Sequence, residues 1–322
     1  MSLVLRLSKE SYVGTHIKLE QMTRQFLEKA GAKHRRWRTG NTKPIEHISE
    51  AWKNCLAKLD PDQAAKIGTL IYCGIDKGVA EPSHASLLAQ KFGLDRVRCL
   101  DLSDACMGWF TATQVASQFA TAKAPYCAIV SAEFPMEIPG RVYPECFTIR
   151  DEQDFLWKGA ALTMGEAASV TIIDSLADES PQVVYTSSSK LADICCVPLL
   201  RADRFVDSPR LSPKLADNCF VSYMPSMALE SYRQAQGILI KYIAEYDRPD
   251  VVLPHLVSQT GPRRASHHHL KDGTLKNCFE HFGNLATCSI PVGYEYFDCN
   301  KNSHVVGWVS AAGMSHGIFR LW

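Results

Sequence analysis

Two features are missing from this 322-residue sequence: a long run of apolar residues and an excess of charge of either sign. No stretch approaches the about 20 apolar residues that a membrane-spanning helix needs. Residues 1–9 already carry Arg6 and Lys9, so they do not have the pattern of a secretory leader. The 35 Lys+Arg and 34 Asp+Glu give a net charge of +1, which creates no overall attraction to nucleic acid or to a membrane surface. The sequence therefore predicts a cytoplasmic protein with neither kind of partner.

Paired cysteines of the CxxC type are also missing, although the chain has 12 cysteines. Only Cys195 and Cys196 are neighbours, and in the cytoplasm we expect the thiols to be reduced. The consecutive histidines at positions 267–269 would point in different directions around a helix, so they do not converge on an ion. The sequence thus predicts no metal site.

What the chain does contain is an alternation of buried strands and helices. Strands are predicted at residues 69–73, 97–101, 126–132 and 168–174, and again at 183–186, 250–254, 305–311 and 318–321. Helices are expected over residues 46–59, 83–92 and 226–246; the second has a capping Ser83 and ends before Gly93. This alternation indicates an α/β fold. The polar residues 175–182 would link an N-terminal half, residues 1–174, to a C-terminal half, residues 183–322.

One cysteine lies where a nucleophile is expected. In VRCLDLSDACMGWF, residues 97–110, a buried strand runs into a short polar turn, and a helix is predicted to begin near Cys106. Unpaired N–H groups at a helix start lower the pKa of a thiol and can hold an oxyanion. The alternative is that Cys106 is a small apolar core residue, which we expect of the other cysteines.

Three further segments carry candidate polar groups. His255 directly follows a predicted strand, at the sheet edge where α/β proteins hold ligands, although a hydrogen-bonded core histidine fits equally well. Asn284 follows Gly283 in HFGNLATCSIP, residues 281–291, where an ordinary turn is the alternative. Residues 309–317, VSAAGMSHG, are mostly small, so a substrate can approach their backbone closely.

The order of these segments resembles the ketoacyl synthase III branch of the thiolase superfamily, over nearly the whole chain. In that family the segments read roughly ACaGF, HQAN, GNTSaaSiP and GGGfTWG, and MGEAAS at residues 164–169 is similar to the family's FGDGAG. The resemblance implies a thiolase-like five-layered αβαβα sandwich of two similar halves, in a homodimer. It also implies acyl thioesters of coenzyme A or of a phosphopantetheinyl carrier protein as substrates, with no permanently bound cofactor.

The resemblance assigns roles to particular residues. Cys106 would accept the acyl group, and His255 and Asn284 would complete the catalytic triad. The backbone N–H groups of Cys106 and Ala312 would hold the oxyanion. The family's HQAN becomes His255, Leu256, Val257 and Ser258 here, which makes Ser258 a candidate substrate-binding hydroxyl.

Another departure concerns Glu81, which precedes Pro82 where the fatty-acid initiation enzymes carry a phenylalanine. This EPSxA pattern is similar to that of the olefin-pathway enzymes, which condense two acyl chains. In those enzymes a glutamate from one subunit serves near the nucleophile across the dimer interface. Glu81 is therefore a candidate general base. The alternative is a carboxylate on an ordinary loop.

A basic segment is the candidate binding site for the carrier. In KAGAKHRRWR, residues 29–38, the cations Lys29 and Arg36 suit a phosphate or an acidic protein surface, and Trp37 can stack on adenine. A merely solvated basic run is the alternative. Arg141 or Arg150 is a further candidate for a phosphate contact, and the sequence does not decide between them.

The resemblance leaves three functions to compare. The first is a condensing enzyme of secondary metabolism that acylates Cys106 and then forms a carbon–carbon bond with a second acyl thioester or a malonyl-type acceptor. The second is acyl transfer to an oxygen or nitrogen of a small molecule, and the third is a non-catalytic thiolase-fold partner subunit. The presence of Cys106, His255 and Asn284 favours an enzyme, and we favour condensation. Acyl chain length, acceptor and pathway are not predicted.

Overall fold

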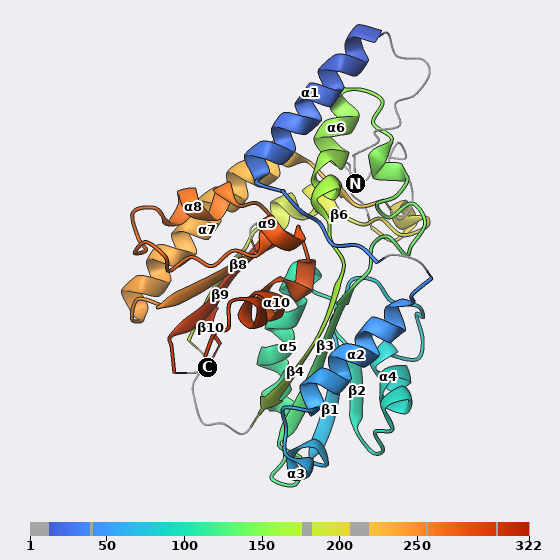
Figure 1. Cartoon of the computed structure of the whole chain (residues 1–322), viewed down its shortest axis with the longest axis vertical. Helices are drawn as coiled ribbons and strands as arrows, with labels where there is room; N and C mark the ends of the chain where they lie inside the picture. The colour runs from blue at the N-terminus through green and yellow to red at the C-terminus, as the bar shows by residue number, and fades with distance from the viewer. Residues whose placement is uncertain are drawn as a thin grey trace.

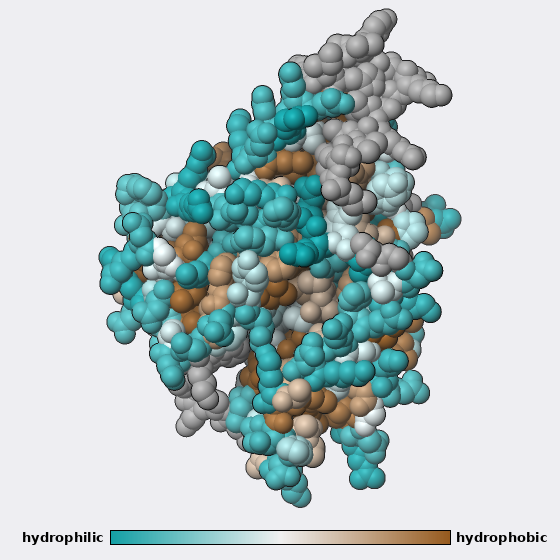
Figure 2. All heavy atoms as spheres, viewed as in Figure 1, coloured by the Kyte–Doolittle hydropathy of each residue, from teal (hydrophilic) through white to brown (hydrophobic). Residues whose placement is uncertain are grey.

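The computed structural model describes residues 13–38, 41–175, 182–206, 219–255, 257–300 and 302–321. Positions 1–9 lie outside these residues, as does most of the predicted link at 175–182. None of the described helices is long and apolar enough to cross a membrane. On the face drawn in Figure 2, hydrophilic residues cover most of the surface and hydrophobic residues appear in separate groups.

Two four-stranded sheets form the frame. The first has the order β2-β1-β3-β4 and consists of β1 (Ile67–Tyr72), β2 (Arg98–Asp101), β3 (Tyr126–Glu133) and β4 (Ala167–Asp174). The second has the order β5-β10-β9-β8 and consists of β5 (Val183–Ser187), β8 (Val251–His255), β9 (Val305–Ala311) and β10 (Ser315–Arg320). A short pair, β6 (Cys195–Cys196) and β7 (Val221–Ser222), lies apart from them. All eight predicted strands are confirmed, with small shifts in their ends.

The described helices are α1 (Val13–Ala30), α2 (Pro44–Leu56), α3 (Pro61–Ala64), α4 (His84–Phe92), α5 (Gly108–Ala116), α6 (Glu152–Lys158), α7 (Met224–Glu245), α8 (Thr260–Ser266), α9 (Phe279–Phe282) and α10 (Ser289–Tyr296). The start and end signals of α4 are confirmed. Ser83 Oγ accepts a hydrogen bond from the Ser86 N–H at 3.1 Å, and Gly93 adopts the left-handed conformation after the last turn.

Successive side chains of a strand point to opposite faces of its sheet, and helices cover both faces of each sheet, so the elements form five layers. On the outer face of the first sheet, Leu70 and Tyr72 of β1 pack with α2 and α4. Ile71 points the other way, into a central core with α5 and α10. That core also contains Leu253 of β8 and Phe319 of β10, so the same two helices support both sheets. Helices α7 and α8 cover the far face of the second sheet. Figure 1 shows α5 and α10 between the two sheets, so the predicted αβαβα order is confirmed.

One strand begins earlier than the sequence pattern indicated. The pattern placed the last strand at residues 318–321, because Ser315 and His316 are polar and Gly317 is flexible. In the structure β10 starts at Ser315 and pairs with β9 from Ala311 onward. His316 is buried and shares a hydrogen bond with Ser310 of β9 at 2.8 Å, which makes a polar residue compatible with a buried strand.

Candidate active site

A cavity of about 950 Å³ opens beside the carboxyl ends of the strands that carry the predicted catalytic residues. Its lining includes six of the residues predicted from sequence, which come from distant parts of the chain: Lys29, Cys106, His255, Ser258, Asn284 and Ala312. Most of the other lining residues are apolar, among them Phe26, Ile75, Val197 and Met227. The cavity is therefore shaped for an apolar ligand with a few fixed polar contacts.

Cys106 lies at a tight turn between β2 and α5. It is the middle residue of a single 3₁₀ turn, Ala105–Met107, and α5 begins directly afterwards at Gly108. Ala105 has φ of +46°, which turns the chain sharply before the cysteine. A side chain at Gly108 would come within 2.8 Å of the Cys73 carbonyl oxygen, so only glycine lets the helix start pack against β1. The turn therefore presents Cys106 to the cavity, as the sequence predicted.

Two opposing influences act on the Cys106 thiol. Burial raises its pKa, and the neighbouring Cys195 and Glu133 raise it further. The backbone N–H groups of Ala312 and of Cys106 itself act in the opposite direction, but the pKa stays above that of a free thiol, so the lowering expected from a helix start is not found. These are the two groups expected to hold an oxyanion, and both lie near the sulfur. The resting thiol is protonated, and negative charge that develops next to it meets two donors.

The hairpin between β9 and β10 delivers the Ala312 donor. Gly313 with φ of +79° and Met314 with φ of +51° take the left-handed positions of the turn. Ala311 and Ala312 are not among the residues with positive φ, so the two alanines sit without backbone strain where the motif of the family that the sequence resembles has glycines. A methyl side chain at Ala312 is therefore compatible with its role as an N–H donor.

His255 is the last residue of β8 and is 4% exposed. Its Nδ1 shares a hydrogen bond with Ser289 Oγ at 2.8 Å, and its Nε2 has no partner among the described residues. Burial lowers the pKa of His255 to about 4, so the imidazole is neutral at physiological pH. When the Ser289 hydroxyl donates to Nδ1, Nε2 carries the proton and can donate to a ligand.

Backbone hydrogen bonds fix Asn284 on the cavity wall. Its N–H donates to the Thr163 carbonyl at 2.8 Å, and its own carbonyl accepts from the Gly165 N–H at 2.8 Å. The side-chain Oδ1 accepts from the Ala286 N–H at 2.9 Å. This last contact sets the orientation of the amide, and the NH₂ group is left as a donor for a ligand.

Gly283 makes the turn before Asn284 possible, and its replacement gives a first prediction. Its φ of 77° and ψ of −159° suit only glycine, and an added Cβ would lie 2.4 Å from the Thr163 carbonyl oxygen. Gly283→Ala should lower the free energy of unfolding in urea by about 3 kcal/mol and displace Asn284. Gly93→Ala is the matched control, since Gly93 is left-handed with open space around it and should cost about 1 kcal/mol. Equal losses in the two variants would contradict the clash.

Ser258 and Lys29 lie toward the outside of the cavity. Ser258 Oγ accepts a hydrogen bond from the Gly261 N–H at 2.8 Å, so it also caps the start of α8. Lys29 is exposed, and its carbonyl accepts a hydrogen bond from Thr260 Oγ1 at 2.8 Å, which ties α1 to α8. Arg264 of α8 is a second exposed cation in the lining, so the rim carries two positive side chains.

Three predicted residues do not line the cavity. Glu81 is exposed on the loop between β1 and α4, and Arg36 is exposed with its guanidinium 5.6 Å from the Phe282 ring centre. Trp37 donates from Nε1 to the Met164 carbonyl at 2.8 Å and packs edge-on against Phe147. Its ring is therefore part of an internal cluster, and this placement gives no support to stacking on adenine. Roles for these three residues stay predictions.

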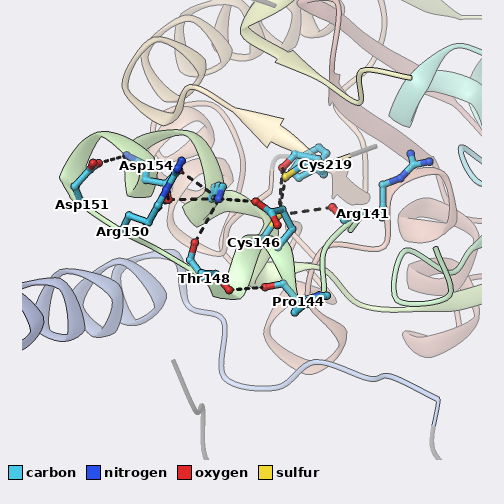
Figure 3. A network of polar contacts seen from close by, with 11 residues as sticks. Arg141, Pro144, Cys146, Thr148, Arg150, Asp151, Asp154 and Cys219 are labelled. Carbon is cyan, nitrogen blue, oxygen red and sulfur yellow. Dashed lines mark hydrogen bonds and ion pairs between the residues drawn. The ribbon is translucent and has the colours of Figure 1, made fainter. Parts of the chain in front are cut away.

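The two arginines considered for a phosphate contact are engaged in ion pairs within the chain. Arg141 is buried and pairs with Asp76 at 3.2 Å. Arg150 pairs with Asp154 of α6 at 3.1 Å. Figure 3 shows the Arg150 and Asp154 side chains together, while the Arg141 guanidinium points away from them. Neither arginine lines the cavity, so the structure favours neither for phosphate.

A buried carboxyl group behind the nucleophile was missed from sequence. Glu133, the last residue of β3, accepts hydrogen bonds from the Thr287 hydroxyl, from the Thr287 N–H at 3.3 Å and from the Ile75 N–H at 3.4 Å. Burial, with Asp76 nearby, raises the pKa of Glu133 to about 8. Through these hydrogen bonds the Glu133 carboxyl group connects the loop after β1 to the segment after Asn284. An acidic residue ending an otherwise apolar strand was the available signal.

Comparison with known proteins identifies the fold. No protein-family model matches the sequence, and no curated protein matches it significantly. Among solved structures, Xanthomonas campestris OleA, a cysteine-to-serine variant with bound lauric acid and lauroyl-CoA, aligns over 96% of this chain and 91% of its own, at 18% identity and a TM-score of 0.76. OleA with bound cerulenin aligns over 96% and 92%, at 18% identity and a TM-score of 0.72.

A second kind of enzyme has the same fold. The β-ketoacyl-[acyl carrier protein] synthase III of Thermus thermophilus aligns over 92% of this chain and 90% of its own, at 18% identity and a TM-score of 0.72. The layers, the cavity and the matched lengths agree with the expectation from the sequence motifs. The chain therefore has the thiolase-like fold shared by OleA and the ketoacyl synthase III enzymes.

Proposed function

We propose that this protein is an acyl-thioester condensing enzyme that becomes acylated on Cys106 and then forms a carbon–carbon bond. The observation that carries the proposal is that Cys106, His255, Asn284 and Ala312, which come from distant parts of the chain, line one cavity. His255 and Asn284 line the same cavity and supply neutral donors. A nucleophile with a preformed oxyanion site and two further donors suits acyl transfer followed by enolate chemistry.

The cavity and its rim support a thioester as the substrate. Apolar walls suit an acyl chain, and the exposed Lys29 and Arg264 suit the phosphates of coenzyme A or an acidic carrier protein. The structurally similar OleA variant holds lauric acid and lauroyl-CoA, and the name of the ketoacyl synthase includes an acyl carrier protein. No permanently bound cofactor is part of the proposal. Among the described residues no group of three potential metal ligands occurs.

The first half-reaction transfers the acyl group between two sulfur atoms. Cys106 Sγ attacks the thioester carbonyl carbon, and the oxygen becomes an oxyanion held by the Cys106 and Ala312 N–H groups. The bond from that carbon to the carrier sulfur then breaks. The proton that leaves Cys106 ends on the departing carrier thiol, so one thiol is exchanged for another.

The second half-reaction forms the carbon–carbon bond. Loss of carbon dioxide from a malonyl-type thioester, or of an α-proton to a base, leaves an enolate. Its oxygen accepts hydrogen bonds from His255 Nε2 and the Asn284 amide. The α-carbon attacks the acyl carbon on Cys106, and the carbon–sulfur bond breaks to leave a thiolate. The thiolate takes one proton, from water after decarboxylation or from the base after α-proton removal.

Acylation with lauroyl-CoA tests the proposal directly. Intact-protein mass spectrometry should show one added acyl group, and peptide mapping should place it on Cys106. Cys195 and Cys196 also line the cavity, so the map distinguishes the proposed nucleophile from two thiols in the same compartment. An unmodified protein, or an acyl group on either of the other two cysteines, contradicts the assignment.

The proposal includes a homodimer. Glu81 is exposed and lies outside the cavity of its own chain, so its proposed role as a base requires the cavity of a partner subunit. As a base donated to the partner's cavity, it would act only in the second half-reaction. Glu81→Gln should therefore form the acyl adduct normally while product formation falls about 100-fold. Asp95→Asn, which removes another exposed loop carboxylate, is the control and should be normal in both assays. Unchanged product formation in Glu81→Gln removes the proposed role.

A further inference from the structure

A second serine–histidine pair has its serine in the cavity wall and its histidine behind it. Ser310 lines the cavity and is 1% exposed, and its Oγ lies 2.8 Å from Nδ1 of His316, which is 0% exposed. The two residues face each other across the paired strands β9 and β10. The reaction described above uses neither residue. Two such polar side chains in an otherwise apolar core require a structural or a ligand-binding reason.

Polar atoms around this pair lack partners. His316 Nε2 and Ser231 Oγ are both buried, and neither has a hydrogen-bond partner in the described part of the chain. Ser231 lines the cavity from α7, and Ala228 and Ala235 line it one turn to either side. These small side chains leave room between α7 and Ser310. An unpaired buried polar atom is unfavourable, and of these two residues only Ser231 lines the cavity, so a ligand there can supply the hydrogen bond that Ser231 lacks.

The subsite is electrically neutral. Burial lowers the pKa of His316 to about 4, against a smaller opposite effect of Glu230, so the imidazole carries no charge at physiological pH. A charged ligand group would lose its hydration here without a counter-charge. A neutral polar group is the suitable occupant.

On these grounds, and on the basis of the proposed function, we propose that Ser310, supported by His316 and Ser231, binds a hydroxyl group carried by the acyl chain of the substrate. The tautomer of His316 decides whether Ser310 donates or accepts within the pair. In one tautomer Ser310 presents only lone pairs to the cavity, and in the other it presents its proton. A hydroxyl group is both donor and acceptor, so it satisfies Ser310 in either case.

The position of the subsite favours the acyl chain over the pantetheine arm, which also carries a hydroxyl. The rim cations Lys29 and Arg264 lie on α1 and α8, and α8 directly follows β8. Ser310 and His316 lie on β9 and β10, which are successively farther from β8 in the sheet. A thioester entering past the cations would reach His255 on β8 before Ser310. The group beyond the reacting carbon is the acyl chain.

Equilibrium binding of free fatty acids tests the subsite without any acyl transfer. Isothermal titration calorimetry would compare dodecanoate with its monohydroxy isomers, with the hydroxyl moved along the chain. One isomer should bind about tenfold more tightly than dodecanoate. Ser310→Ala should abolish this advantage while changing dodecanoate affinity less than twofold, and Ser310→Thr should keep it. Ser266→Ala, at a buried serine outside the lining, is the control and should keep it.

Several results would overturn the subsite. They are equal binding of all isomers, no measurable binding of any acid, or an advantage that survives Ser310→Ala. Weaker binding of unacylated coenzyme A to Ser310→Ala would overturn it too, because the pair would then recognise the pantetheine hydroxyl. The proposed function fails separately, if lauroyl-CoA leaves Cys106 unmodified. A preference for a hydroxy acid in that event would keep the subsite as a binding site without condensation.

Discussion

Cys106→Ala is expected to give a folded protein that takes up no acyl group from lauroyl-CoA and makes no condensation product. The Cys106 sulfur lies near the Cys106 and Ala312 N–H groups, so acylation at this thiol places the oxyanion beside these proposed donors. Removing the nucleophile removes both half-reactions together. Intact-protein mass and product assays after incubation with the thioester measure the two losses.

Cys195→Ala is the matched control for that variant. Cys195 is buried, lines the same cavity and lies close enough to Cys106 to raise its pKa. This control should form the adduct at a rate close to that of the unmodified protein. An adduct that persists in Cys106→Ala and disappears in Cys195→Ala would move the nucleophile to the second position.

Asn284→Ala is expected to separate the two half-reactions. The first develops charge on an oxygen held by backbone N–H groups, which this variant keeps. The second develops enolate charge that the Asn284 amide stabilises, and loss of one such donor costs about 2.7 to 4 kcal/mol of barrier. Adduct formation should therefore change little, while condensation falls by about 10² to 10³. Single-turnover acylation and steady-state product formation give the two rates.

The control for Asn284 is another buried amide. Asn277 is buried outside the cavity lining, and its Nδ2 donates to the Ser258 carbonyl at 2.9 Å. Asn277→Ala should change both rates by a similar factor, because it acts on the stability of the loop. Equal loss of both rates in Asn284→Ala would mean that the amide only supports the fold.

The sequence was informative where local chemistry determines structure. Each predicted strand was an apolar run bounded by turn residues, and the buried sheets confirmed them. Cys106, His255 and Asn284 were singled out near strand ends and helix starts, and the family resemblance assigned their catalytic roles, which stay predictions; the structure brings the three residues to one cavity. The division into halves at residues 174 and 183 stays a prediction.

The features that the sequence did not reveal depend on contacts between segments that are far apart in the chain. The Ser310–His316 pair was missed because its stability comes from register between β9 and β10, which no local pattern encodes. The hydrogen bonds of Glu133 come from residues 58 and 154 positions away. Trp37 lies in a basic segment, from which we predicted that its ring stacks on adenine. In the structure the Trp37 ring packs against Phe147, a contact that the local sequence does not indicate. The position of Glu81 relative to a second subunit lies beyond what a single chain determines.

The two proposed oxyanion donors come from opposite sheets, Cys106 after β2 and Ala312 after β9. The proposed reactivity toward thioesters would therefore be a property of the assembled tertiary structure. A folding intermediate with only one sheet formed has a thiol but no paired donors, so it would not consume activated acyl groups. Acylation kinetics during refolding would consequently report the moment at which the two sheets dock on α5 and α10.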